Sequence, residues 1–132
     1  MRSVITPNSV FKFELLKVES NEQIAERAAD KVVCSWTVPE DLPYLAGHFP
    51  NQPVVPAVAI IDAALEVLSQ GLKQKLSLQK VKNAKFTSPL LPGTTVQIEA
   101  MKISEFEWSV DFKGEQQVAK ILLSFVFHSV SS

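Results

Sequence analysis

One long apolar segment constrains this chain more than any other feature. Between Pro56 and Leu72 the only charged residues are Asp62 and Glu66. Proline suits the first position of a helix, where its missing N–H has no partner. Apolar residues at helical spacing cover well over half of the circumference, which predicts burial on most sides. The two neighbouring apolar stripes are formed by Val58, Ile61, Leu65, Leu68 and Leu72, and by Ile60, Ala64 and Val67.

Strand patterns surround this predicted helix. Alternation of apolar and polar residues predicts strands over 11–18, 31–38, 81–86, 94–103, 106–113 and 117–127. Pro92-Gly93 predicts a tight turn, Lys113-Gly114-Glu115 predicts a hairpin, and the proline-rich stretch 39–56 predicts a stiff loop. One buried helix and about six strands predict an α+β domain in which an antiparallel sheet curls around the helix.

Charge and cysteine content exclude several classes of protein. The formal net charge of −1 argues against a general nucleic-acid binder. Cys34 is the only cysteine, which excludes an internal disulfide or a cysteine-rich metal site and favours a reducing compartment. The N-terminus lacks the apolar run of a signal peptide, and no stretch is long and apolar enough for a membrane span. We therefore expect a cytoplasmic protein without a membrane partner.

A histidine and an aspartate offer the residue types that proton transfer requires. His48 lies in the stretch Gly47–Pro56, where Phe49 and Pro50 restrain the backbone that follows it, and a neutral imidazole is the usual general base near neutral pH. Asp62 lies within the apolar helix. Three environments are open for it: a solvent-exposed strip with Glu66 and Ser69, a hydrogen bond to a backbone amide, or a cleft where desolvation raises the pKa of its carboxyl.

The predicted start of the helix adds a third chemical group. The first amides of a helix have no internal partner and carry positive partial charge. Because Pro56 has no N–H, the Ala57 and Val58 amides are the first donors, and they are either capped by water or polarise a carbonyl oxygen, as an oxyanion hole does.

Other polar and reactive residues carry weaker expectations. Lys73, Lys75, Lys80, Lys82 and Lys85 fall in a stretch without acidic residues, which forms either a solvated face or a surface that steers an acidic partner. We expect His128 to be exposed and Cys34, Trp36 and Trp108 to serve packing.

The motif that holds these groups resembles a known family. Gly47-His48-Phe49-Pro50-x-x-Pro53-Val54-Val55-Pro56-x-Val58-x-Ile60-Ile61-Asp62 is similar to the active-site signature of the hot-dog-fold 3-hydroxyacyl-[acyl-carrier-protein] dehydratases. The segment 84–93 resembles the strand and turn that follow in that family. The resemblance covers about residues 41–127 and implies one hot-dog domain over residues 1–132, with an antiparallel sheet wrapped around a long helix.

The resemblance also implies an activity and an assembly. His48 would take the C2 proton of a 3-hydroxyacyl thioester on acyl carrier protein, Asp62 would protonate the leaving hydroxyl, and the Ala57 amide would hold the thioester oxygen. It further implies substrate contacts for Phe49, Pro50, Val58 and Glu66, no cofactor or metal, and a homodimer in which His48 and Asp62 come from opposite subunits. The five lysines would suit docking of an acidic carrier protein in fatty-acid or polyene-type biosynthesis.

The motif departs from the family at several positions. Asn51 and Ala57 stand where glycine is usual, and Glu66 stands where glutamine is common. Thr87 and Ser88 replace a basic pair, and Asp62 replaces the glutamate of the housekeeping branch. These departures favour a divergent member. Two alternatives stay open: a thioester hydrolase in which Asp62 or Glu66 activates water, and a non-catalytic acyl-binding partner subunit.

Overall fold

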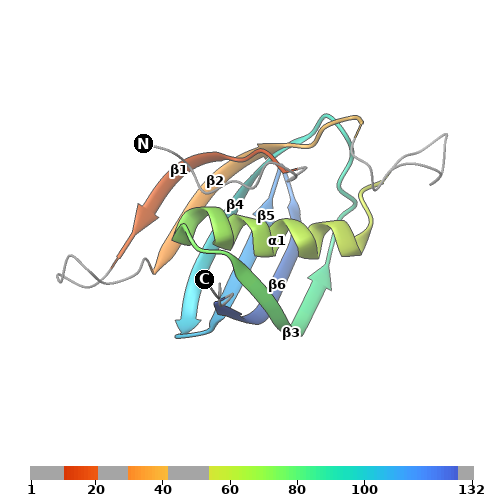
Figure 1. Ribbon diagram of the computed structural model, residues 1–132. Coiled ribbons are helices and arrows are strands. Elements are labelled where there is room, and N and C mark those ends of the chain that lie inside the picture. Colours follow the sequence, from red (N-terminus) through yellow and green to blue (C-terminus); the bar gives the residue numbers. More distant parts are fainter. Residues whose placement is uncertain (1–10, 21–29, 42–53, 128–132) are drawn as a thin grey trace.

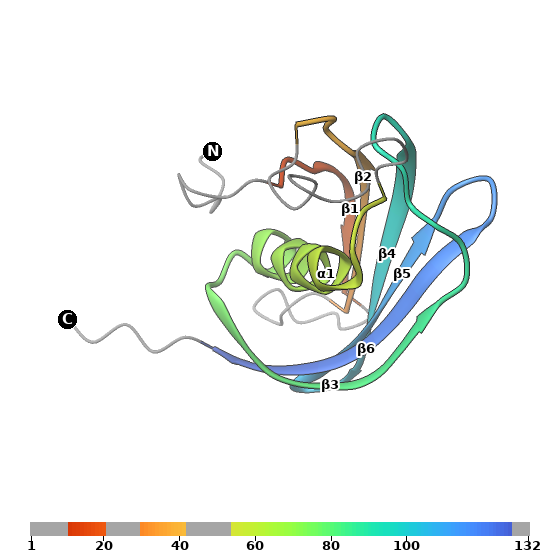
Figure 2. The same ribbon diagram turned by 90° about the vertical axis from the view of Figure 1, so that its right-hand side faces the viewer.

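A six-stranded antiparallel sheet curves around one helix in the computed structural model, which describes residues 11–20, 30–41 and 54–127 (Figure 1). The elements are β1 (Glu14–Glu19), β2 (Lys31–Thr37), α1 (Ala57–Leu72), β3 (Leu76–Phe86), β4 (Thr95–Ser104), β5 (Glu107–Lys113) and β6 (Gln117–Phe127). The strand order is β1-β2-β4-β5-β6-β3, so β1 and β3 form the two edges. Figure 2 looks along α1 and shows the sheet curving round one side of it, which confirms the predicted α+β architecture.

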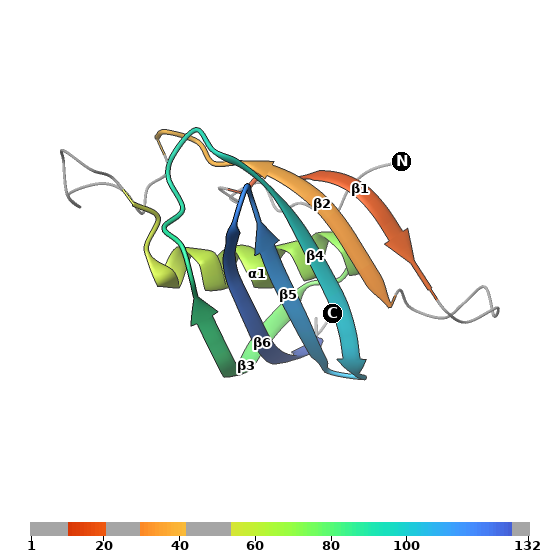
Figure 3. The same ribbon diagram turned by 180° about the vertical axis from the view of Figure 1, so that it is seen from behind.

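The concave face of the sheet supplies the core. Trp108, Val110 and Phe112 alternate along β5 and are buried, as the strict alternation of that strand predicts. Their partners on β6, in the same order, are Leu123, Ile121 and Ala119, and these are buried too. The other face of the sheet is turned away from α1, as Figure 3 shows.

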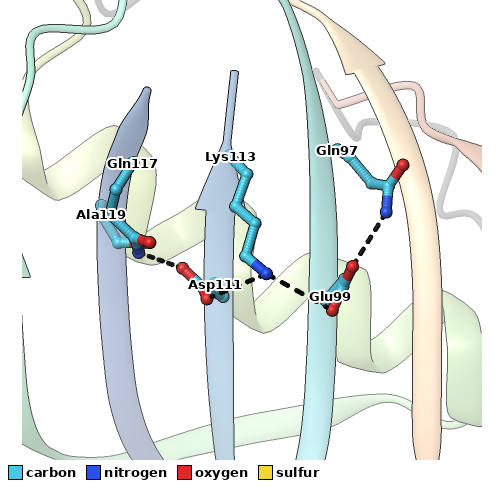
Figure 4. Close-up of polar contacts among 6 residues, drawn as sticks. All are labelled: Gln97, Glu99, Asp111, Lys113, Gln117 and Ala119. Carbon is cyan, nitrogen blue, oxygen red and sulfur yellow. Dashed lines mark hydrogen bonds and ion pairs between the residues drawn. The ribbon is translucent and has the colours of Figure 1, made fainter. Parts of the chain in front are cut away.

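A polar network covers part of this outer face (Figure 4). The Lys113 Nζ lies 3.8 Å from a Glu99 oxygen and 3.7 Å from an Asp111 oxygen. Gln97 Nε2 donates to Glu99 over 2.9 Å, and Gln117 Nε2 donates to Asp111. The cation of Lys113 is therefore balanced by Glu99 on the neighbouring strand β4 and by Asp111 on its own strand β5, and glutamines donate to both carboxylates.

The bounds of two strands differ from the sequence prediction by more than one residue. β1 begins at Glu14 rather than Phe11, and a bulge between Leu15 and Lys17 interrupts its pairing with β2. Phe11 and Phe13 instead stack on each other, with ring centroids 5.9 Å apart, and both meet Trp36 edge-on. β3 begins at Leu76, five residues earlier than predicted. The prediction missed these residues because much of this edge strand is exposed, and its apolar alternation is therefore weak.

The helix is buried on one side only, which corrects the expectation of burial on most sides. Its buried residues are Ala59, Ile60, Ala63, Ala64, Val67, Leu68 and Gly71. Val58 is 57% exposed, and Ile61, Leu65 and Leu72 are only partly covered. A single sheet can cover one face of a helix, so an apolar stripe remains at the surface of this chain.

The segment between β3 and β4 closes with a glycine-dependent turn. The Thr94 amide donates to the Leu91 carbonyl over 3.2 Å, with Pro92 and Gly93 at the centre of the turn. Gly93 has φ = 84°, and a type II turn requires such a positive φ at this position. The tight turn predicted at Pro92-Gly93 is therefore confirmed.

Replacing Gly93 is expected to destabilise the protein. Gly93→Ala forces a Cβ into a positive-φ conformation, at a cost of about 1–2 kcal/mol of unfolding free energy. Gly93→Asn should cost less, because asparagine tolerates this region better. Urea unfolding of the three proteins checks the order, and equal midpoints would contradict it.

Candidate functional site

An apolar cavity of about 350 Å³ lies at the start of α1. Its walls come from the segment before the helix, from the helix, and from the end of β3 with the turn 87–90. The lining side chains include Val54, Val55, Ala57, Ile60, Phe86 and Leu90. Carbon atoms dominate these walls, so the cavity suits an aliphatic or acyl group better than a charged one.

Backbone hydrogen bonds hold the walls together. The Val55 amide donates to the Leu90 carbonyl over 2.9 Å, which joins the entry of the helix to the turn after β3. The Thr87 amide donates to the Val118 carbonyl over 2.8 Å, which fixes the same turn to β6. Main-chain hydrogen bonds thus hold the segments that form the cavity walls in place.

The first amides of α1 face this region without a capping side chain. Pro56 is the N-cap residue with extended backbone (φ −71°, ψ 158°), so the helix begins at Ala57 rather than at the predicted Pro56. The Ala59 and Ile60 amides both donate to the Pro56 carbonyl, at 3.0 and 3.3 Å. In the described part of the chain, no acidic residue lies in the first turn. The N-terminal partial charge therefore remains available to an electronegative ligand atom.

Asp62 lies one turn beyond the start of the helix. Asp62, Glu66 and Ser69 are all half-buried and share one strip of α1. Gln70 Nε2 donates to a Glu66 oxygen over 3.2 Å and to the Phe11 carbonyl over 3.4 Å. Glu66 is therefore held from the C-terminal side, whereas Asp62 lies nearer the cavity.

Three predicted site residues cannot be compared with the structure. His48, Phe49 and Pro50 lie outside the described residues, as do Asn51 and His128. The structure places the Ala57 backbone at the cavity and leaves Val58 on the exposed helix surface. The roles of all seven site residues remain predictions.

The lysines predicted to form one docking stretch are spread over two parts of the molecule. Lys73 and Lys75 follow the C-terminus of α1, which is about 24 Å from its start at 1.5 Å per residue. Lys80, Lys82 and Lys85 lie on β3, where Lys82 forms an ion pair with Glu107. Only Lys85 adjoins the cavity, because Phe86 is one of its walls.

The packing roles expected of Cys34, Trp36 and Trp108 are confirmed, since each is 1% exposed. Burial raises the pKa of the Cys34 thiol to about 12. A thiol in this state is a poor nucleophile.

Phe86, Ile60 and Leu90 were missed as candidates in the sequence. Each carries an apolar side chain that a sequence pattern assigns to the core, and nothing in the pattern separates a core wall from a cavity wall. Only the proximity of segments 54–60 and 86–90 reveals their shared position.

In sequence, the chain is similar to known dehydratases. A family model described as ApeI dehydratase (ApeI-like) matches residues 23–124. A protein named 3-hydroxyacyl-[acyl-carrier-protein] dehydratase FabZ from Wolbachia sp. subsp. Brugia malayi is 29% identical in an alignment over 104 residues that covers 67% of this chain and 70% of that protein. The protein of the same name from Solibacter usitatus is 32% identical in an alignment over 97 residues that covers 67% of this chain and 59% of that protein.

Solved structures share the architecture. The dehydratase heterocomplex ApeI:P from Xenorhabdus doucetiae contains a chain with a TM-score of 0.69 and 22% identity, covering 86% of this chain and 97% of the other. A hypothetical thioesterase with coenzyme A from Streptococcus pneumoniae has a TM-score of 0.63 at 10% identity, covering 92% and 89%. At these identities the likeness shows the hot-dog fold alone.

Proposed function

Because the chain belongs to the ApeI-like dehydratase family, we propose that it removes water from a 3-hydroxyacyl thioester on acyl carrier protein and yields a trans-2-enoyl thioester. The family membership rests on a match over residues 23–124. The observation that carries the proposal further is the apolar cavity beside the first amides of α1, one turn from Asp62. A protein that acts on a cytoplasmic carrier would itself be cytoplasmic.

Each step of the proposed reaction has a residue in this chain. His48 removes the proton at C2 of the substrate, and the electron pair forms the C2–C3 double bond. The C3–O bond breaks as Asp62 gives its proton to the departing hydroxyl, which leaves as water. The Ala57 amide donates to the thioester oxygen, on which negative charge develops. Proton transfer from His48 back to Asp62 restores both groups, so the net reaction needs no cofactor.

The cavity supports this assignment by its position. Ala57 is both a wall of the cavity and the first residue of the helix, so a thioester oxygen at its amide would direct the adjoining acyl carbons toward apolar side chains. The methyl group of Ala57 narrows this approach relative to the glycine usual in the family. We infer that it restricts the acyl groups that enter, which agrees with a divergent member.

Mass spectrometry of carrier-bound substrates tests the reaction. A panel of 3-hydroxyacyl carrier proteins of different chain lengths is incubated with the protein, and at least one is expected to lose one water. Free thiol is measured in parallel. Thiol release without enoyl formation would instead establish the thioester hydrolase, and loss of neither group from any substrate would contradict both.

We infer that two subunits assemble through the β3 edge. Within the described sheet, β3 has β6 as its only neighbour, so the main chain on its other side is open to a further strand. Leu78 and Phe86 on this strand are 40% and 43% exposed. The partly covered stripe of α1 that contains Leu65 gives a second apolar surface. Shared active sites, with His48 and Asp62 from opposite subunits, are part of this proposal.

Leu78→Glu tests this assembly. The substitution puts a charge on the proposed interface, and loss of one buried leucine at about 1.5–3 kcal/mol corresponds to roughly ten- to hundredfold weaker association. Leu15→Glu is the matched control, because Leu15 is 47% exposed on the opposite edge strand. Analytical ultracentrifugation should show dissociation of the Leu78 variant alone, with loss of activity. A fully active wild-type monomer would refute shared sites.

The Xenorhabdus structure makes a mixed assembly the second candidate. That chain belongs to a dehydratase heterocomplex, and a non-identical subunit at the β3 edge would make this chain a partner subunit. The same ultracentrifugation experiment distinguishes the two, because a chain that needs a different partner stays monomeric and inactive when purified alone.

A further inference from the structure

Two lysines lie directly opposite each other on the outer face of the sheet. Lys85 on β3 pairs with Lys120 on β6 in the strand register, and both side chains are exposed. Like charges in directly opposed positions of an antiparallel pair destabilise it. The fold therefore keeps an unfavourable pair at this point, where a neutral residue would serve the sheet better.

The carboxylates nearby leave this pair unbalanced. Asp111 lies opposite Lys120 on β5, yet its carboxylate contacts Lys113 and Gln117 instead. Among the described residues, neither Lys85 nor Lys120 has a carboxylate oxygen within 4.0 Å. Lys82, in contrast, is engaged by Glu107.

The pair lies next to a residue that lines the cavity at the start of α1. Phe86 follows Lys85, lines the cavity, and is directly opposite Ala119, the residue before Lys120. Lys80 is five residues away along β3, or about 16 Å, and Lys75 follows the far end of the helix. Lys85 is therefore the neighbour in sequence of a residue of the cavity wall, and Lys120 lies opposite Lys85 on the adjacent strand.

We propose that Lys85 and Lys120 form the docking point for the acidic surface of the carrier protein whose acyl thioester enters this cavity. The inference rests on the proposed function and replaces the five-lysine stretch by a two-lysine pair, one member of which lies outside that stretch. Two exposed ammonium groups on the face of a sheet suit a broad acidic protein surface. A carrier carboxylate between them relieves the repulsion that the free protein retains.

Lys120→Glu tests the docking point, because it reverses one of the two charges. KM for a carrier-bound 3-hydroxyacyl substrate is expected to rise about tenfold or more, with kcat within about twofold. KM for the same acyl group on pantetheine, which lacks the carrier protein, should not change.

Lys75→Glu is the matched control, since it makes the same charge change at an exposed position by the far end of α1. It should alter KM for neither substrate. An unchanged KM of the Lys120 variant on the carrier substrate, or an equal rise on both substrates, would overturn the docking point.

Failure of the proposed function remains distinguishable from failure of docking. If the wild type converts neither substrate, binding of the carrier protein alone is measured by titration calorimetry at low and high salt. Salt-sensitive binding that Lys120→Glu weakens about tenfold would uphold the docking point, and no binding by the wild type would overturn it.

Discussion

Asp62→Asn is expected to lower kcat for enoyl formation by about 10²- to 10⁴-fold, the range for loss of a general acid or base. Asparagine keeps the size of the side chain and its place on α1, but its amide cannot supply the proton that the departing hydroxyl requires. KM should change little, since the apolar cavity and the Ala57 amide are untouched. Enoyl absorbance under substrate saturation gives kcat directly.

Glu66→Gln provides the comparison within the same helix. Glu66 is one turn from Asp62, is also half-buried, and accepts a hydrogen bond from Gln70 that a glutamine oxygen can still accept. Its kcat should stay within about tenfold of wild type. If the Glu66 variant loses activity and the Asp62 variant keeps it, the acid has been assigned to the wrong carboxylate. Circular dichroism shows whether both variants retain the fold.

Gly71→Ala is expected to lower the unfolding free energy by about 1–3 kcal/mol, the cost of overpacking a core. Within a helix, this change would normally stabilise by up to about 1 kcal/mol. Here a Cβ on Gly71 would lie 2.6 and 2.7 Å from the two γ-carbons of Val32 and 3.2 Å from its Cβ. Val32 is fully buried and β-branched, so it cannot turn aside.

Two further substitutions separate steric conflict from helix propensity. Ser69→Ala raises the helix propensity at a half-buried position of α1 and introduces no steric conflict of this kind. It should leave the unfolding free energy unchanged or raise it slightly. Val32→Ala should cost less in the Gly71→Ala background than in the wild type, because it removes the clash. Denaturant unfolding of this double-mutant cycle gives the coupling energy, and additive effects would exclude the Val32 contact as the cause.

The sequence predicted the elements with strong periodicity and missed those without it. β6 was predicted with its observed bounds, because Ala119, Ile121, Leu123 and Phe125 alternate without interruption and are all buried. β3 lies at an edge, where exposure weakens alternation, so its first five residues were missed. The sequence does place apolar residues around most of the helix. How many of these residues the sheet buries depends on tertiary packing, which the sequence pattern does not show.

The candidate site was only partly predictable for a related reason. Ala57 and Asp62 were identified because a helix start and a charge within an apolar helix are local signals. The cavity wall at Phe86 depends on pairing between β3 and β6 and on the contact between Val55 and Leu90, which are distant in sequence. The Lys85–Lys120 pair likewise exists only through strand register. Local patterns do not show which strands that are distant in sequence pair with each other.

The thiol of Cys34 can report local unfolding of the sheet around β2. With a pKa of about 12, the thiol is almost wholly protonated at neutral pH, and its side chain is sealed beneath the sheet. A thiol-specific reagent can react only after β2 separates from its neighbours, so the labelling rate follows the frequency of that event. When free thiol is measured to test for thioester hydrolysis, the folded protein therefore adds no background. A slow rise in the thiol signal of the protein alone would measure its unfolding during the reaction.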